Sequence, residues 1–171
     1  MILAVDVAYR KGEARAAGVL FHTWDACETS RVAFARCAEV AAYVPGQFYK
    51  RELPPILALL EQFEEIPAYV LVDGYVYLGR KRRPGLGRHL YDALQGQAAV
   101  IGVAKSRFRG TPAATHVLRG NSRRPLYVTA VGVCEVQARR WIAGMCGAHR
   151  VPKMLRLADR LSKGREGAYE D

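Results

Sequence analysis

Three acidic residues stand out because each adjoins a segment that is otherwise apolar. Asp6 interrupts the apolar run 2–8. Glu52 precedes an apolar helical pattern, and Asp73 directly follows the short run 68–72. Carboxylates gathered within a few ångströms repel one another unless a cation lies between them, and oxygen ligands suit Mg²⁺ or Mn²⁺. Such a centre can catalyse phosphodiester hydrolysis. Each acid also has a simpler interpretation, as a satisfied edge residue, a residue favoured at a helix N-terminus, or a turn signal.

The periodicity of the apolar residues predicts the elements that must hold these acids. We expect strands at 2–8, 14–22, 31–37, 68–72, 98–104, 114–119 and 126–133, and helices at 53–63, 89–97, 134–145 and 152–161. Glu52 is expected just before the first helix. If the first and fourth strands are neighbours, Asp6 and Asp73 can meet at one edge of the sheet, and the carboxyl ends of strands are where α/β folds place their sites.

Positive charge is concentrated in the second half of the chain. Residues 1–72 carry 7 Lys and Arg against 9 Asp and Glu, whereas residues 73–171 carry 19 against 7. The densest positive charge lies in the glycine-rich loop 79–88, which contains Arg80, Lys81, Arg82 and Arg83. A basic surface of this kind favours a polyanion such as nucleic acid, with an ordinary solvated face as the alternative.

Length and composition predict one domain, residues 1–163, followed by a disordered tail at 164–171. We expect no signal peptide, because no basic region precedes the N-terminal apolar residues, and no uncharged run approaches the ~20 residues of a membrane span. The cysteines form no Cys-x-x-Cys pair, so we expect free thiols in a reducing compartment; they are Cys27, Cys37, Cys134 and Cys146. We therefore expect a cytoplasmic monomer that binds no membrane.

Short motifs follow one another in order over nearly the whole chain. They are AVDVAY around Asp6, YVPG at 43–46 with Glu52 nine residues after Tyr43, LVDG at 71–74, GLGRHL at 85–90, IGVAKS at 101–106, PLYVT at 125–129 and HRVPKMLRLADRL at 149–161. Together they resemble the endonuclease V (deoxyinosine 3′ endonuclease) family. The resemblance implies an α/β fold with a ribonuclease H-like mixed central sheet flanked by helices.

The same resemblance implies an activity and a substrate class. It implies a divalent-metal-dependent endonuclease of the DNA-repair type, which hydrolyses a phosphodiester near a deaminated base, hypoxanthine, in DNA or RNA. Cleavage in this family falls one linkage beyond the lesion on its 3′ side. The base is recognised outside the stack, which is consistent with base flipping.

Roles follow by resemblance for individual residues. Asp6, Glu52 and Asp73 correspond to metal-binding catalytic acids, with Mg²⁺ or Mn²⁺ as the cofactor. Lys105 corresponds to a lysine that contacts the scissile region. The residues assigned to nucleic acid are a strand-separating wedge, Tyr43, Val44, Pro45 and Gly46, and two glycines near the pocket for the extruded base, Gly46 and Gly74.

The chain departs from the family pattern at a few positions. Val76 replaces the second glycine of an Asp-Gly-x-Gly motif, and Gly79 stands where the family has a histidine. A second family histidine is replaced by Val131 or Val133, for which Glu135 or His116 could compensate, and most of the family's N-terminal extension is absent. Two alternatives therefore stay open. One is a nuclease with relaxed or redirected specificity for structured DNA, other lesions or RNA. The other is a catalytically weak nucleic-acid-binding protein, whose binding would be steeply salt-dependent.

Overall fold

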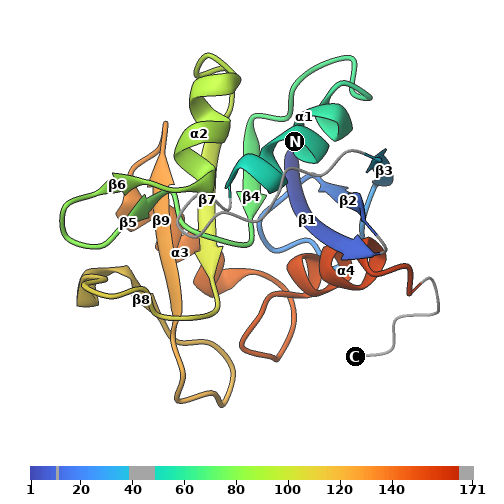
Figure 1. Cartoon of the computed structure of the whole chain (residues 1–171). Coiled ribbons are helices and arrows are strands. Elements are labelled where there is room, and N and C mark those ends of the chain that lie inside the picture. Colours follow the sequence, from blue (N-terminus) through green and yellow to red (C-terminus); the bar gives the residue numbers. More distant parts are fainter. Residues whose placement is uncertain (11, 39–48, 166–171) are drawn as a thin grey trace.

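A mixed seven-stranded sheet organises the computed structural model of the chain, which describes residues 1–10, 12–38 and 49–165 (Figure 1). The strand order is β3-β2-β1-β4-β7-β9-β8. The strands are β1 Ile2–Arg10, β2 Glu13–Phe21, β3 Arg31–Cys37, β4 Tyr69–Val72, β7 Ala99–Ala104, β8 His116–Val117 and β9 Leu126–Val131. A separate hairpin pairs β5 Tyr77–Leu78 with β6 Arg83–Pro84.

The pairing of the strands explains why acids far apart in the sequence can meet. β1 runs antiparallel to β2 but parallel to β4, and β4 runs parallel to β7. The first and fourth strands are therefore neighbours, which was the condition for Asp6 and Asp73 to meet, and they run in the same direction. The predicted α/β class with a mixed central sheet is confirmed.

Helices cover both faces of this sheet (Figure 1). They are α1 Tyr49–Leu60, α2 Leu86–Ala93, α3 Glu135–Gly144 and α4 Lys153–Ser162. Successive side chains of a strand point to opposite faces. In β1, Ile2 and Ala4 accordingly join the core beneath α3 and α4, whereas Leu3 and Val5 join the core beneath α1 and α2. None of the helices in the described ranges is both long and apolar enough to span a membrane.

Two boundaries differ from the prediction in ways that affect the site. Helix α1 begins at Tyr49, so Glu52 lies within its first turn and not before it. Pro54 and Pro55 lie inside this helix, past its first turn, where each removes one backbone hydrogen bond. The basic loop at 79–88 contains the turn and the second strand of the β5–β6 hairpin and the start of α2, none of which its glycine and arginine content had indicated.

The expectation of four free cysteines is wrong. A disulfide joins Cys27 to Cys146, across 119 residues, while Cys37 and Cys134 are free. Sequence spacing could not indicate this pair, because a disulfide depends on the distance between two Cα atoms in the fold. The bond ties the loop between β2 and β3 to the connection between α3 and α4.

Arg119 also holds the connection between α3 and α4, from the protein interior. Its side chain is buried, and its guanidinium donates hydrogen bonds to backbone carbonyls of the segment, those of Ala143, Met145, Gly147, His149 and Arg150. A planar guanidinium with five donors can satisfy several carbonyls at the end of a helix at once. Together with the disulfide, Arg119 therefore sets the position from which α4 starts.

Candidate active site

Three carboxylates from distant parts of the chain come together where β4 ends beside the middle of β1. Asp6 lies on the face of β1 that α4 covers, Asp73 follows the last residue of β4, and Asp159 lies on α4. One oxygen from each of them can be chosen so that all three lie within 4.8 Å of one another. Oxygen donors at such spacing fit a hard divalent cation.

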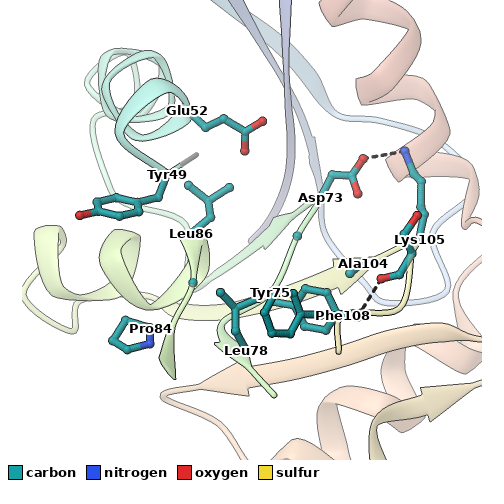
Figure 2. A pocket seen from close by; sticks show the side chains of 13 residues that line it. Tyr49, Glu52, Asp73, Tyr75, Leu78, Pro84, Leu86, Ala104, Lys105 and Phe108 are labelled. Atoms are coloured by element: carbon teal, nitrogen blue, oxygen red, sulfur yellow. Dashed lines mark hydrogen bonds and ion pairs between the residues drawn. The ribbon is translucent and has the colours of Figure 1, made fainter. Parts of the chain in front are cut away.

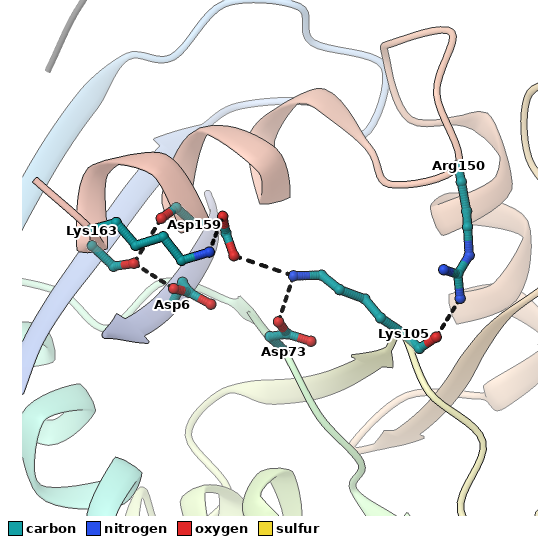
Figure 3. Close-up of polar contacts among 7 residues, drawn as sticks. Asp6, Asp73, Lys105, Arg150, Asp159 and Lys163 are labelled. Atoms are coloured by element: carbon teal, nitrogen blue, oxygen red, sulfur yellow. Dashed lines mark hydrogen bonds and ion pairs between the residues drawn. The ribbon is translucent and has the colours of Figure 1, made fainter. Parts of the chain in front are cut away.

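Two lysines offset part of this negative charge (Figure 3). The Lys105 ammonium lies 2.7 Å from Asp73 Oδ2 and 3.4 Å from Asp159 Oδ1. The Lys163 ammonium lies 2.7 Å from the other oxygen of Asp159. Lys105 comes directly after β7, and the structure places this predicted site lysine beside Asp73.

Neighbouring polar groups hold these side chains in place. The Ser162 hydroxyl, buried at the end of α4, donates a hydrogen bond to Asp6 Oδ2. Arg150 donates to the backbone carbonyl of Lys105 and, at 2.8 Å, to that of Pro125. Orientation of charged groups by a surrounding shell of hydrogen bonds is what a metal-dependent site requires.

Glu52 faces the same groove from the other side of the sheet. It is buried in α1, and with Asp6, Asp73 and Asp159 it lines a groove of about 540 Å³. It is not one of the three acids whose oxygens cluster. The physical reason is the alternation of β1, which directs Asp6 toward α4 while α1 packs on the opposite face.

Burial and mutual repulsion shift the titration of these acids. Burial, opposed by the Ser162 hydrogen bond and assisted by Asp73 and Asp159, raises the pKa of Asp6 to about 6. Burial and the charges of Asp6 and Asp73 raise the pKa of Glu52 to about 8. Burial alone would raise the pKa of Asp159, but Lys163 and Lys105 lower it below its ordinary value. Ionisation of Asp6 and Glu52 is thus unfavourable until a cation binds beside them.

The metal-free protein is therefore expected to lose stability as the pH rises from 5 to 8. The folded state binds protons at Asp6 and Glu52 more tightly than the unfolded state, because both pKa values are raised, so the free energy of unfolding falls as pH passes through the folded values. We expect a loss on the order of 2–4 kcal/mol, or several degrees in Tm, measured by thermal unfolding in EDTA. Mg²⁺ or Mn²⁺ should raise Tm more at pH 8 than at pH 5.

An Asp6→Asn, Glu52→Gln double variant is the control for this measurement. Its Tm should change little over the same pH range and should not respond to the metal. An equal fall of Tm with pH in the variant and the wild type would contradict the assignment to these two carboxyls.

A largely apolar pocket of about 490 Å³ adjoins the acids (Figure 2). Glu52 and Asp73 lie at one end of it in the view, and Tyr75, Leu78 and Phe108 lie at the other. The predicted Gly74 lines it as well. The pocket is concave, mostly apolar and bordered by a few polar groups, which is the usual form of a small-ligand or base site.

The floor of this pocket is held by Tyr75. Its hydroxyl donates to the Ser106 carbonyl at 2.8 Å and accepts from the Phe108 N–H at 3.1 Å. The turn at 73–75 also lies directly against β7, because a Cβ at Gly102 would come within 2.5 Å of the Gly74 carbonyl oxygen. The shape of the pocket is therefore set by backbone contacts that only a glycine on β7 permits.

The two departures from the family motif leave this pocket intact. Val76 is fully buried, packs toward Gly87 and Val100, and is not among the residues that line the pocket. Its N–H donates to Thr129 Oγ1 at 2.8 Å. Gly79 has a φ of +62°, which favours glycine, and it too lies outside the lining. The substitutions thus affect the core and a turn, not the pocket surface.

The predicted basic residues of the 80–83 segment form an exposed hairpin loop. Arg80, Lys81, Arg82 and Arg83 are all exposed. Arg82 is held by an ion pair with Glu135 at 3.0 Å and stacks over Tyr77. Arg83 lies over the Phe108 ring, which brings its charge to the edge of the pocket. The predicted wedge, Tyr43, Val44, Pro45 and Gly46, lies outside the described residues.

Sequence reasoning missed Asp159 in the acidic cluster. Glu135 and His116, named as replacements for a lost histidine, do not belong to that cluster; Glu135 pairs with Arg82, and His116 packs edge-on against Tyr127. A signal was available, because Asp159 is the only acid between residues 136 and 165, in a stretch rich in Lys and Arg. Its contact with Asp6 nevertheless depends on how α4 crosses the sheet.

The sequence of this chain is similar to those of known proteins. The family model for endonuclease V matches residues 1–134. Endonuclease V of Alkalilimnicola ehrlichii is 33% identical over 152 residues, which cover 77% of this chain and 66% of that protein. The chain thus spans about two thirds of the length of this relative.

Solved structures show the same fold. Endonuclease V from Streptomyces avermitilis is 31% identical, with a TM-score of 0.72, and the match covers 95% of this chain and 79% of that one. Endonuclease V of Ciona intestinalis, solved with a 24mer DNA that contains an inosine followed by a ribo-adenosine, is 20% identical, with a TM-score of 0.75 and coverage of 95% and 84%. At that identity the second match shows the fold alone.

Proposed function

This chain belongs to the endonuclease V family, whose members are nucleases, and we propose that it hydrolyses a phosphodiester near a deaminated base, hypoxanthine, in DNA or RNA. The main support for the proposal is that a cluster of acids lies directly beside an apolar pocket. Three carboxylates with oxygens within 4.8 Å adjoin an apolar pocket of about 490 Å³, and Asp73 takes part in both. The Ciona protein was solved with inosine-containing DNA, whereas for this chain the substrate class is proposed from its family membership.

The acids are proposed to hold Mg²⁺ or Mn²⁺. Asp6, Asp73 and Asp159 supply oxygen ligands, and Glu52 completes the set from the α1 side of the groove. A divalent ion bound by such ligands supplies Lewis-acid stabilisation of the charge that develops on phosphodiester oxygens. Asp6 and Glu52, which ionise reluctantly by themselves, become good ligands when a cation shares the site.

Lys105 and the pocket are proposed to place the substrate. The Lys105 ammonium lies between the acids and the pocket, so it can contact the phosphate that follows an extruded base. Tyr75 and Phe108 offer ring faces to that base, while the Tyr75 hydroxyl is already used by the 106–108 backbone. Recognition of a base outside the stack in a pocket of this kind is consistent with base flipping. We place the wedge role on Tyr43 to Gly46 by family resemblance alone.

We also infer that the enzyme works in the cytoplasm, where its nucleic-acid substrates occur. The Cys27–Cys146 disulfide removes the free-thiol argument for this location, because disulfides are rare in reducing compartments, so the inference rests on the substrates alone.

A cleavage panel tests the function. Oligonucleotides with inosine, uracil, a mismatch or no lesion, each as DNA and as RNA, are incubated with Mg²⁺, Mn²⁺ or EDTA. We expect nicking one linkage 3′ of inosine, with a rate at least about tenfold above that for undamaged strands, equivalent to more than about 1.4 kcal/mol of discrimination. Equal rates for all substrates would instead establish a relaxed nuclease. Tight binding without any product would establish a binding protein.

A further inference from the structure

We propose that a hollow beside the end of α4, lined by Arg15 and Arg36, binds a backbone phosphate of the strand being cut, within about two linkages of the cleaved bond. This subsite rests on the proposed function, because it assumes a nucleic-acid substrate. It adds a second point at which the protein contacts the backbone of the strand being cut. The hollow measures about 330 Å³ and is lined by Ala8, Tyr9, Arg10, Glu13, Arg15, Arg36, Ser162, Lys163 and Gly164.

The sheet register places both arginines on the face that carries Asp6. Asp6 lies opposite Ala17 on β2, and two residues further along, Ala8 lies opposite Arg15. Arg15 in turn lies opposite Arg36 on β3. Directly opposite residues on antiparallel strands point to the same face. The surface that presents a catalytic acid therefore continues, two residues along the strand, into a pair of guanidinium groups.

The hollow is continuous with the acidic groove. Ala8, Tyr9 and Lys163 line both the hollow and the groove that contains Asp6 and Asp73. Two residues of β-strand correspond to about 6.6 Å, and β2 and β3, which carry Arg15 and Arg36, lie about 4.8 and 9.6 Å across the sheet from β1. A strand whose scissile phosphate lies at the acids can thus reach the arginines with a neighbouring phosphate, without leaving the surface.

Charge favours an anion at this place. Four of the residues lining the hollow are cations and one, Glu13, is an acid. Arg15 and Arg36 lie directly opposite each other on neighbouring strands, which concentrates positive charge at this place. Arg15 is also packed in place, with its guanidinium over the Phe34 ring at 4.5 Å and against Gly164. A guanidinium fixed in this way is a suitable partner for a phosphate.

The salt dependence of binding tests this subsite. The affinity of metal-free protein for inosine-containing and undamaged duplexes is measured by fluorescence anisotropy from 50 to 200 mM KCl. For the Arg15→Gln, Arg36→Gln variant we expect binding weakened on the order of tenfold on both duplexes and a log–log salt slope smaller by about one, since one lost phosphate contact removes about 0.9.

Two matched variants control for net charge and for folding. Arg123→Gln with Arg124→Gln removes the same charge from two exposed arginines in the turn before β9 and should leave the slope unchanged. Arg15→Lys with Arg36→Lys keeps the charge and should keep most of the slope. A wild-type slope in the Arg15→Gln, Arg36→Gln variant, or an equal loss in the Arg123→Gln, Arg124→Gln variant, would overturn the proposal.

A methylphosphonate scan then locates the phosphate. Single linkages on either side of the inosine are made neutral in turn. One or two neighbouring linkages should weaken binding by wild type but not by the Arg15→Gln, Arg36→Gln variant, whereas the same profile for both proteins would refute the subsite. These binding data are independent of base specificity, so the two proposals can fail separately. Inosine-directed nicking with an unchanged salt slope would refute only the subsite. A reduced salt slope without a preference for inosine would refute only the proposed substrate.

Discussion

Replacing Asp6 or Asp73 by asparagine is expected to abolish divalent-metal-dependent nicking of an inosine-containing oligonucleotide. Each substitution removes a negatively charged ligand from the cluster with Asp159 while keeping the size of the side chain. A Lewis-acid contribution of several kcal/mol corresponds to a rate loss of about 10³-fold or more. Single-turnover rates with saturating enzyme in Mg²⁺ and in Mn²⁺ measure the effect.

Stability measurements separate this loss from misfolding. Burial and neighbouring acids raise the pKa of Asp6, so asparagine at that position should leave the Tm of the metal-free protein at pH 8 equal to or higher than that of the wild type. Asp92→Asn is the matched control, because Asp92 is exposed on α2 and pairs with Arg88. It should nick at the wild-type rate. Undiminished nicking by both the Asp6 and the Asp73 variants would exclude this mechanism.

Replacing Asp159 by asparagine is expected to slow nicking by about 100-fold at low metal concentration. The substitution takes one ligand from the cluster and leaves Lys105 and Lys163 without their shared carboxylate partner. Because two acidic ligands remain, raising the Mn²⁺ concentration should restore part of the rate. Rates measured across a metal titration should therefore show a shifted metal dependence, whereas a variant that merely disturbs α4 would lose rate at every concentration.

Glu135→Gln tests the alternative that the sequence suggested. Glu135 pairs with Arg82 in the basic hairpin, so its variant should keep the wild-type metal dependence and a rate within about threefold, as expected for a surface ion pair. A metal-dependent defect in this variant together with normal behaviour of Asp159→Asn would reverse the two assignments.

Local sequence patterns predicted most of the strands and helices, because the spacing of apolar residues shows which side chains share a face of one strand or helix. Alternation identified the strand at Arg31–Cys37 with its observed bounds, and it found β1, β2, β4 and β7 within two residues at each end. The meeting of Asp6 and Asp73 was expected only on the condition that the first and fourth strands are neighbours, which the observed strand order meets. The signals were weaker where glycine and arginine dominate, and there the β5–β6 hairpin and the start of α2 were missed.

By itself, the sequence indicated the family, the mixed α/β class and, on the condition that the first and fourth strands are neighbours, the meeting of Asp6 with Asp73. Only the tertiary structure decided that α4 brings Asp159 to those acids, that Cys27 bonds to Cys146, and that Arg15 and Arg36 align on the face of Asp6. The physical reason is the same in each case. Periodicity fixes which way a side chain points from its own strand or helix, whereas its neighbours from residues far along the chain depend on how buried apolar faces pack over the sheet.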